Sequence, residues 1–162
     1  MREGIDRAVS DLMDVNEHLQ EISRGIHPAI LARGGLGPAL TTLARRSTVP
    51  VELDVSNETR LPAPVEVAAY YVVSEALTNV AKYADASAAH VVAKVHANQL
   101  ELSIRDDGRG GADPRRGSGL IGLTDRVEAL GGKLHITSVR GTGTTLHVTL
   151  PLDRPERDGA RT

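Results

Sequence analysis

The chain has 162 residues, of which 40% are apolar and 25% charged, and its formal net charge is -2. This length predicts one domain, and the absence of Cys excludes disulfides and thiolate chemistry. Charges of both signs are interspersed, so no basic field favours nucleic acid as a partner. With neither an apolar run of membrane-spanning length nor a signal-peptide core, the chain is expected to be cytoplasmic.

The first part of the chain predicts two helices and a strand. Residues 3–24 place apolar side chains at steps of four and three, a heptad-like seam typical of a bundle helix. This helix is expected to end near Pro28, because proline disfavours helical geometry in the residue before it. Residues 37–47 predict a second helix, with Pro38 near its first turn. Alternating apolar residues at 49–55 predict a strand.

The middle of the chain predicts a long helix and a hairpin. Residues 64–84 keep apolar side chains at helical spacing. Residues 88–97 and 99–107 read as two strands, and their short connection suits a hairpin. The Gly-rich stretch "DDGRGGADPRRGSG", residues 106–119, then interrupts the pattern.

The last part predicts a helix, two strands and a tail. The helix at 120–132 closes with two glycines, the strands at 133–152 are joined at "RGTG", and the polar residues 153–162 are expected to be disordered. Adjacent strands late in the chain favour antiparallel pairing, with the helices gathered on one face of a mixed sheet. The predicted fold is therefore an α+β sandwich of two layers.

One face of the long helix carries polar groups beside its apolar stripe. Glu75, Asn79 and Lys82 fall within about 60° of one another at helical spacing. A solvated helix face would account for these three residues when they are considered alone. They do not by themselves distinguish a binding site from ordinary surface.

Two glycine clusters follow where a ligand could approach the backbone. The strand at 99–107 ends in two aspartates and runs directly into "GRGG", which places acceptors beside glycines whose backbone a ligand can approach closely. The second cluster, at 117–122, opens a helix, and helix N-termini favour phosphate. This cluster also matches a dinucleotide fingerprint, but no strand of a β-α-β unit leads into it, which excludes that interpretation.

Taken together, these residues resemble the ATP-binding catalytic domain of two-component sensor histidine kinases, in the superfamily that includes gyrase, the heat-shock chaperone ATPase and MutL. "EALTNVAKYA" resembles the N box, "DDGRG" the first Gly box, "GSGLIGL" the second and "GTGT" the closing Gly-Thr box, in family order. The resemblance covers residues 19–152 and implies a Bergerat-type ATP-binding fold. "IHPAIL", "GLGPAL", "LTDRVEALGG" and the short loop at 110–117 are similar to the NarL-type subfamily.

The resemblance implies ATP and Mg²⁺ as cofactors and a role for each site residue. Asn79 would supply an amide oxygen to Mg²⁺, a hard cation that prefers oxygen. Glu75 would be catalytic, accepting or orienting the proton of the nucleophile, and Lys82 would meet phosphate. Asp106, rather than Asp107, would accept a hydrogen bond from the adenine amine and so select ATP over GTP. The remaining nucleotide-binding residues would be Gly108, Gly110, Gly117, Gly119, Leu120, Gly122 and Thr144.

The same resemblance divides the chain into three parts. Residues 1–26 would be the end of the second dimerisation helix and a linker, residues 27–152 the ATP-binding domain, and residues 153–162 a disordered tail. The implied reaction transfers the γ-phosphoryl group of ATP to a His on an upstream helix, for relay to an Asp of a response regulator. The implied partners are that regulator and the dimerisation and phosphoacceptor domain of a homodimeric parent kinase, whether or not the parent is anchored in a membrane.

No phosphoacceptor is expected within this chain. His27 precedes Pro28 at a helix end, where the family has a linker, and His18 is followed by Leu19 instead of the acidic residue that follows the acceptor. The chain is therefore expected not to phosphorylate itself. Tyr83 departs from the subfamily, which usually has His there, so its role is left open.

Two other functions fit less of the sequence. A serine kinase of the anti-sigma-factor type, or another ATPase of the superfamily, is disfavoured by the helical seam and the "IHP" linker. A nucleotide-binding module that signals by conformation alone is disfavoured because Glu75, Asn79 and Asp106 are all present.

Overall fold

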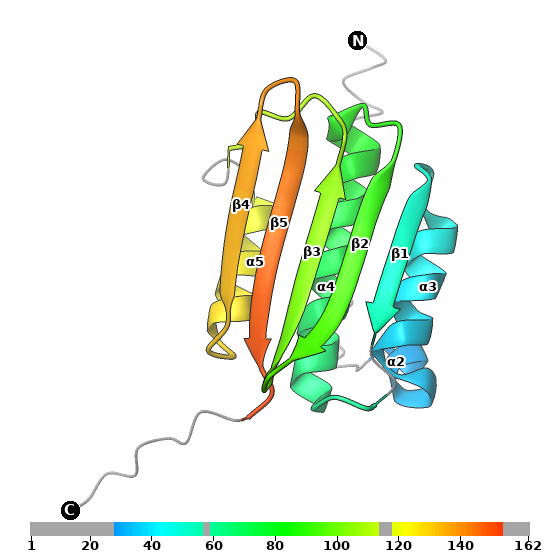
Figure 1. The fold of residues 1–162 in the computed structure, drawn as a ribbon, viewed down its shortest axis with the longest axis vertical. Coiled ribbons are helices and arrows are strands. Elements are labelled where there is room, and N and C mark those ends of the chain that lie inside the picture. Colours follow the sequence, from blue (N-terminus) through cyan, green and yellow to red (C-terminus); the bar gives the residue numbers. More distant parts are fainter. Residues whose placement is uncertain (1–27, 57–58, 114–117, 154–162) are drawn as a thin grey trace, which may run out of the picture.

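A computed structural model describes residues 28–56, 59–113 and 118–153, which form a two-layer α+β structure. Within these ranges, the strands form one sheet in the order β1-β2-β3-β5-β4 (Figure 1). β1 pairs with β2 in parallel, and the other neighbours pair antiparallel. The strands are β1 Val51–Ser56, β2 Ala89–His96, β3 Gln99–Asp106, β4 Lys133–Val139 and β5 Gly143–Pro151.

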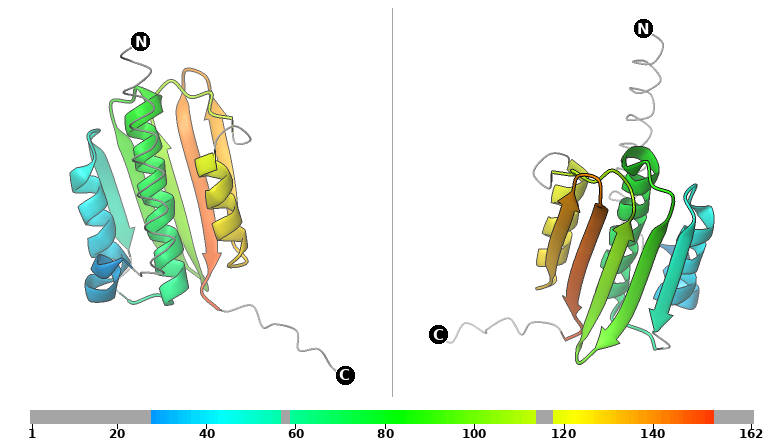
Figure 2. Two further views of the ribbon diagram at one scale, coloured as in Figure 1. Left: turned by 180° about the vertical axis from the view of Figure 1, so that it is seen from behind. Right: turned by 45° about the horizontal axis from the view of Figure 1, so that its top comes forward.

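The described helices all pack on one face of the sheet, as Figure 2 shows from behind. They are α2 Ala29–Gly34, α3 Leu36–Arg46, α4 Ala63–Asn79, the π-helical η1 Val80–Ala84 and α5 Ser118–Glu128. α4 forms the crossover between β1 and β2, which allows these two strands to run parallel. The predicted two-layer α+β fold with a mixed sheet is confirmed.

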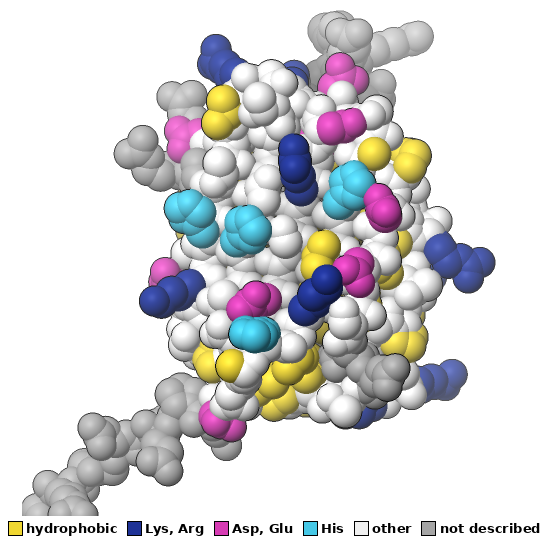
Figure 3. Space-filling view, in the orientation of Figure 1, with side chains coloured by type: hydrophobic (Ala, Val, Ile, Leu, Met, Phe, Trp, Pro, Cys, Tyr) yellow, Lys and Arg dark blue, Asp and Glu magenta, His cyan; other side chains and the backbone are white. Residues whose placement is uncertain are grey.

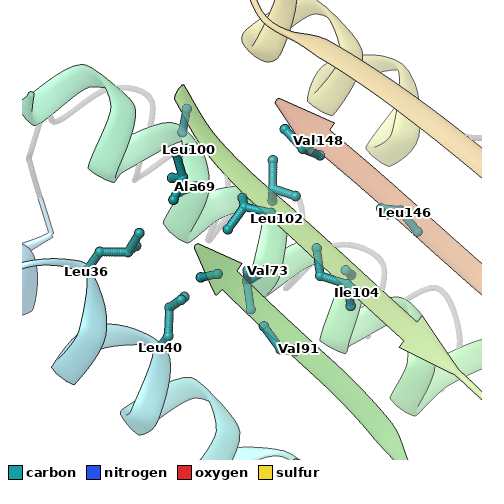
Figure 4. Close-up of a cluster of buried hydrophobic side chains, with 14 of the residues drawn as sticks. Leu36, Leu40, Ala69, Val73, Val91, Leu100, Leu102, Ile104, Leu146 and Val148 are labelled. Atoms are coloured by element: carbon teal, nitrogen blue, oxygen red, sulfur yellow. The ribbon is translucent and has the colours of Figure 1, made fainter. Parts of the chain in front are cut away.

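The core lies between the helices and the sheet and is built from aliphatic side chains, since the chain has no Phe or Trp. Ala69 and Val73 of α4 are buried against alternate residues of β3, Leu100, Leu102 and Ile104 (Figure 4). Truncating one of these leucines to Ala would cost about 2–5 kcal/mol of stability. This packing fixes α4 against the centre of the sheet, and with it the polar groups at the end of α4.

The opposite face of the sheet is open and polar (Figure 3). Glu52 pairs with His90 at 2.9 Å and Asp54 with Lys94 at 2.8 Å, across β1 and β2. The alternation predicted for the strands is therefore confirmed, because polar residues occupy this face while apolar residues face the helices.

Two features of the fold differ from expectation. The sequence does not predict α2, because its six residues are too few to show a helical period. The long helix predicted at residues 64–84 is present, but its last turn, η1, is π-helical.

The helix expected at residues 3–24 and the tail beyond residue 153 lie outside the described residues. None of the described helices is long and apolar enough to cross a membrane.

Candidate functional site

Those residues singled out from the sequence that the structure describes belong to segments that meet at one end of the sheet, at the top of Figure 1. Four segments meet there: the end of α4 with η1, the loop after β3, the start of α5 and the hairpin between β4 and β5. The topology brings them together, because β3 runs antiparallel to its neighbours β2 and β5 and therefore ends at the end of the sheet where those two strands begin. Segments that are far apart in the sequence therefore contribute to one site.

The polar stripe of α4 lies at the C-terminal end of the helix. Glu75 and Asn79 are half-buried, and Lys82 is exposed. Lys82 and Tyr83 belong to η1, and the side chain of Tyr83 is 52% exposed. Asp85 ends η1 in a left-handed conformation with a φ of 51°, which Asp tolerates better than most residues. π-helical turns are frequent at functional sites.

The start of α5 lies against this stripe. A Cβ atom at Gly119 would collide with the carboxylate of Glu75, so packing brings these two predicted site residues together. Farther along α5, the guanidinium of Arg126 lies 4.4 Å from the centre of the Tyr71 ring on α4. This cation–π contact helps to hold α5 against α4.

The other residues of the second glycine cluster are less constrained by packing. Leu120 is half-buried against the core. Gly122 is exposed, and a Cβ atom there would have no neighbour within 4 Å. Gly117 lies outside the described residues. A side chain at position 119 would therefore displace the Glu75 carboxylate, whereas one at position 122 would meet no neighbour.

Asp106, at the end of β3, combines burial with an available acceptor. Only 5% of its surface is exposed, and its Oδ1 accepts a hydrogen bond from the Gly108 N–H at 2.9 Å. Within the described residues, no protein group donates to its Oδ2, and this atom is not sealed from solvent. Oδ2 can therefore accept a hydrogen bond from a ligand.

Asp107 is exposed, and its carboxylate is already occupied by protein groups. It accepts hydrogen bonds from the Ser87 hydroxyl, from the Ser87 N–H at 2.8 Å and from the Ala88 N–H at 3.1 Å. The Ser87 hydroxyl, followed by the Ala88 N–H, lowers the pKa of Asp107 below its ordinary value. Asp107 thus fixes the segment before β2 and leaves Asp106 as the carboxylate available to a ligand.

The loop after β3 is held by main-chain contacts on both sides. The Arg109 N–H donates to the Ala84 carbonyl at 2.7 Å, and the Arg109 carbonyl accepts from the Gly141 N–H at 2.8 Å. A Cβ atom at Gly108 would collide with the Ala84 carbonyl. One at Gly110, where φ is +60°, would collide with the backbone of the β4–β5 hairpin. Both positions need glycine because neighbouring backbone comes too close for a side chain.

Thr144 lies on the same face of β5 as the buried residues Leu146 and Val148. Its hydroxyl lies 2.7 Å from the Ser138 hydroxyl on β4, which also accepts a hydrogen bond from the Ala112 N–H at 2.9 Å. The sequence pattern does not single out Ser138, because only the register of β4 and β5 reveals that it lies opposite Thr144.

Comparison with known proteins finds histidine kinases and the ATPase family to which they belong. The family model described as "Histidine kinase-, DNA gyrase B-, and HSP90-like ATPase" matches residues 65–154, more than half of the 162-residue chain. The chain is 33% identical to sensor histidine kinase NarS of Mycobacterium tuberculosis, covering 94% of this chain and 38% of that protein. It is 32% identical to the histidine-protein kinase/phosphatase DegS of Brevibacillus brevis, covering 94% of this chain and 44% of that protein.

A solved structure shares the fold. The blue-light activated histidine kinase EL346 of Erythrobacter litoralis matches with a TM-score of 0.62 and 26% identity, covering 73% of this chain and 41% of that one. The chain spans about two fifths of the length of the curated relatives named above.

Proposed function

The chain belongs to the family of histidine kinase-, DNA gyrase B- and HSP90-like ATPases, and from this we propose that it is the ATP-binding catalytic domain of a sensor histidine kinase of the NarL-type subfamily. Membership of this family implies ATP binding. The proposed reaction moves the γ-phosphoryl group of ATP to a histidine in the dimerisation domain of a homodimeric parent kinase. A response-regulator aspartate then receives it. The domain acts in the cytoplasm, whether or not the parent kinase is anchored in a membrane.

The observation that carries this proposal is the buried carboxylate of Asp106 with one oxygen available. Adenine presents an amine donor at the position where guanine has a carbonyl acceptor. Because a carboxylate can only accept, Oδ2 of Asp106 matches adenine and leaves guanine unmatched. Burial strengthens this preference, since an unmatched polar group costs more where water is excluded. Gly108 and Gly110 let the base pass close to the loop.

The phosphates are proposed to lie between the polar stripe of α4 and the start of α5. Asn79 supplies an oxygen to Mg²⁺, an ion that usually takes one or two protein ligands and completes its shell with phosphate and water. Lys82 neutralises phosphate charge. The first N–H groups of α5, near Gly119 and Leu120, favour an anion. Further contacts are proposed for Gly117, Gly122 and Thr144.

Glu75 is the proposed catalytic residue. It is half-buried one turn before Asn79, and its carboxylate lies beside Gly119 at the start of α5. There it accepts or orients the proton of the attacking imidazole while the nitrogen–phosphorus bond forms and ADP leaves. Charge neutralisation and positioning by the remaining residues supply the rest of the catalysis.

Substitution of Asp106 by Asn tests the base-recognition proposal. Asp106→Asn keeps the shape and an acceptor for the Gly108 N–H, but it presents an amide donor to the base. ATP affinity is expected to fall about 10–100-fold, and GTP affinity to rise. Isothermal titration calorimetry with both nucleotides measures this, with Asp107→Asn as the matched control. An unchanged ATP-to-GTP ratio in Asp106→Asn would contradict the assignment.

Labelling with γ-labelled ATP tests the proposed reaction. Acid-labile label is expected on an added phosphoacceptor domain and not on this chain alone. Asn79→Ala should abolish the transfer, because Mg²⁺ loses its protein ligand. Full transfer by Asn79→Ala would favour a module that acts by conformation alone. Label on the isolated chain would place an acceptor within it.

A further inference from the structure

We propose that Ser138 is a positioning residue of the nucleotide site, which holds the loop after β3 and directs the hydroxyl of Thr144 toward the ligand. The inference rests on the proposed ATP site. Ser138 touches no nucleotide in this scheme and acts through Ala112 and Thr144.

The geometry around Ser138 links two parts of the site through one side chain. Ser138 is half-buried near the end of β4, opposite Thr144 in the register with β5. Its Oγ lies 2.9 Å from the backbone nitrogen of Ala112, in the loop after β3, and 2.7 Å from Oγ1 of Thr144. One hydroxyl therefore connects the loop after β3, next to the first glycine cluster, to Thr144 near the start of β5.

The direction of one of these bonds is fixed, and the direction of the other is part of the proposal. An amide N–H can only donate, so Ser138 accepts from Ala112. The 2.7 Å contact with Thr144 allows either hydroxyl to donate, and the proposed arrangement is the one in which Ser138 donates to the Thr144 oxygen. With Ser138 donating, the proton of Thr144 is free to meet a nucleotide oxygen. Each bond in this chain polarises the next, so the last donor is strengthened.

The Ser138 contact anchors the loop through a side chain from another strand, so a substitution outside the loop can remove it. Arg109 and Gly110 are held by backbone contacts with Gly141 and its neighbours in the hairpin. Ala112, by contrast, is held by a side chain. Removing the Ser138 hydroxyl should therefore release the backbone at Ala112 and leave Arg109 and Gly110 in place.

Three variants separate this role from general packing. Ser138→Ala removes the hydroxyl, Ser138→Thr retains it, and Thr137→Ala removes an exposed hydroxyl from the adjacent position, on the other face of β4. ATP affinity, measured by isothermal titration calorimetry, is expected to fall about fivefold to tenfold in Ser138→Ala, as for loss of one hydrogen bond. Ser138→Thr and Thr137→Ala should stay within about twofold of the wild type.

A double-mutant cycle tests whether Ser138 acts through Thr144. Thr144→Val removes the second hydroxyl with little change in shape. If the two hydroxyls form one chain, the double variant loses less affinity than the product of the two single losses. Independent, multiplicative losses would overturn the proposed chain.

The outcomes also distinguish this inference from the proposed function. Unchanged affinity in Ser138→Ala, or a loss that Ser138→Thr does not restore, would overturn the role of Ser138. A wild-type chain that binds no ATP would overturn the proposed function instead. In that case amide hydrogen exchange at Ala112 still tests the anchorage, because it should be faster in Ser138→Ala and unchanged in Thr137→Ala.

Discussion

At the scale of single residues, Asp106 and Asp107 show how adjacent identical side chains come to lie in different surroundings. The alternation of β3, with Leu102 and Ile104 inward, is enough to predict that Asp106 faces the core side. The sequence cannot reveal that Asp107 is occupied by Ser87 and Ala88, because those residues come close only through the pairing of β2 with β3.

The lowered pKa of Asp107 predicts a pH dependence of stability. Its folded-state pKa lies below the unfolded value, so the unfolded chain binds more protons and stability rises with pH. This contribution is fully present above the unfolded pKa, about 3.9, and is lost as the pH falls through the lower folded pKa. Asp107→Asn should therefore be less stable than the wild type at pH 7, with the difference shrinking on acidification. Urea midpoints measured at a series of pH values check this, and a constant difference would contradict it.

At the scale of elements, an ion pair between the exposed Arg60 and the buried Glu66 fixes the start of α4. Glu66, in the first turn, is fully buried and accepts hydrogen bonds at 3.1 Å from the Nε and Nη2 of Arg60 and from the Leu61 N–H. The helix dipole also favours a carboxylate there. The pair joins the segment before α4 to the helix that carries the polar stripe at its other end.

Loss of this pair should cost more than loss of a pair on the open face. Arg60→Ala leaves a buried carboxylate without its cation and is expected to lower the free energy of unfolding by about 1–3 kcal/mol. Lys94→Ala, which removes the exposed partner of Asp54, should cost less than about 1 kcal/mol. Urea denaturation of both variants measures the difference. Equal losses would show that burial does not decide the strength of these pairs.

The two glycines of α5 should respond differently to alanine. Gly122→Ala is expected to stabilise the chain by up to about 1 kcal/mol, because alanine favours helix and meets no neighbour there. Gly119→Ala should displace the Glu75 carboxylate and reduce phosphotransfer in the presence of an acceptor domain. Thermal unfolding and transfer rates are the measurements. Full transfer by a folded Gly119→Ala would contradict the proposed role of Glu75.

At the scale of the whole molecule, most of the fold could be predicted from side-chain periodicity. The strands and α4 could be identified in this way because each buries one face of a regular element. α2 is too short to show a helical period. The π-helical turn η1 could not be predicted either, because its residues are typical of an α-helix and only its hydrogen bonding differs. The order in which the strands assemble, and hence the contact of Ser138 with Ala112, depends on tertiary pairing that local patterns do not encode.

Ligand binding should stabilise the whole domain by mass action. Mg-ATP at 100 times its dissociation constant adds about 2.7 kcal/mol, which corresponds to a rise in Tm of roughly 5–10 °C for a chain of this size. Thermal unfolding with ATP, with and without Mg²⁺, measures this. Asn79→Ala should lose the Mg²⁺-dependent part of the rise. An equal rise with GTP would contradict the proposed recognition of adenine by Asp106.

The position between the first two glycines of the loop after β3 should tolerate an unusually wide choice of residues. Arg109 contributes to the fold through its N–H and its carbonyl, which bind Ala84 and Gly141, while its side chain is exposed. A library randomised at this position should therefore retain nearly every amino acid in folded clones. Proline is the exception, because it has no N–H to donate to Ala84.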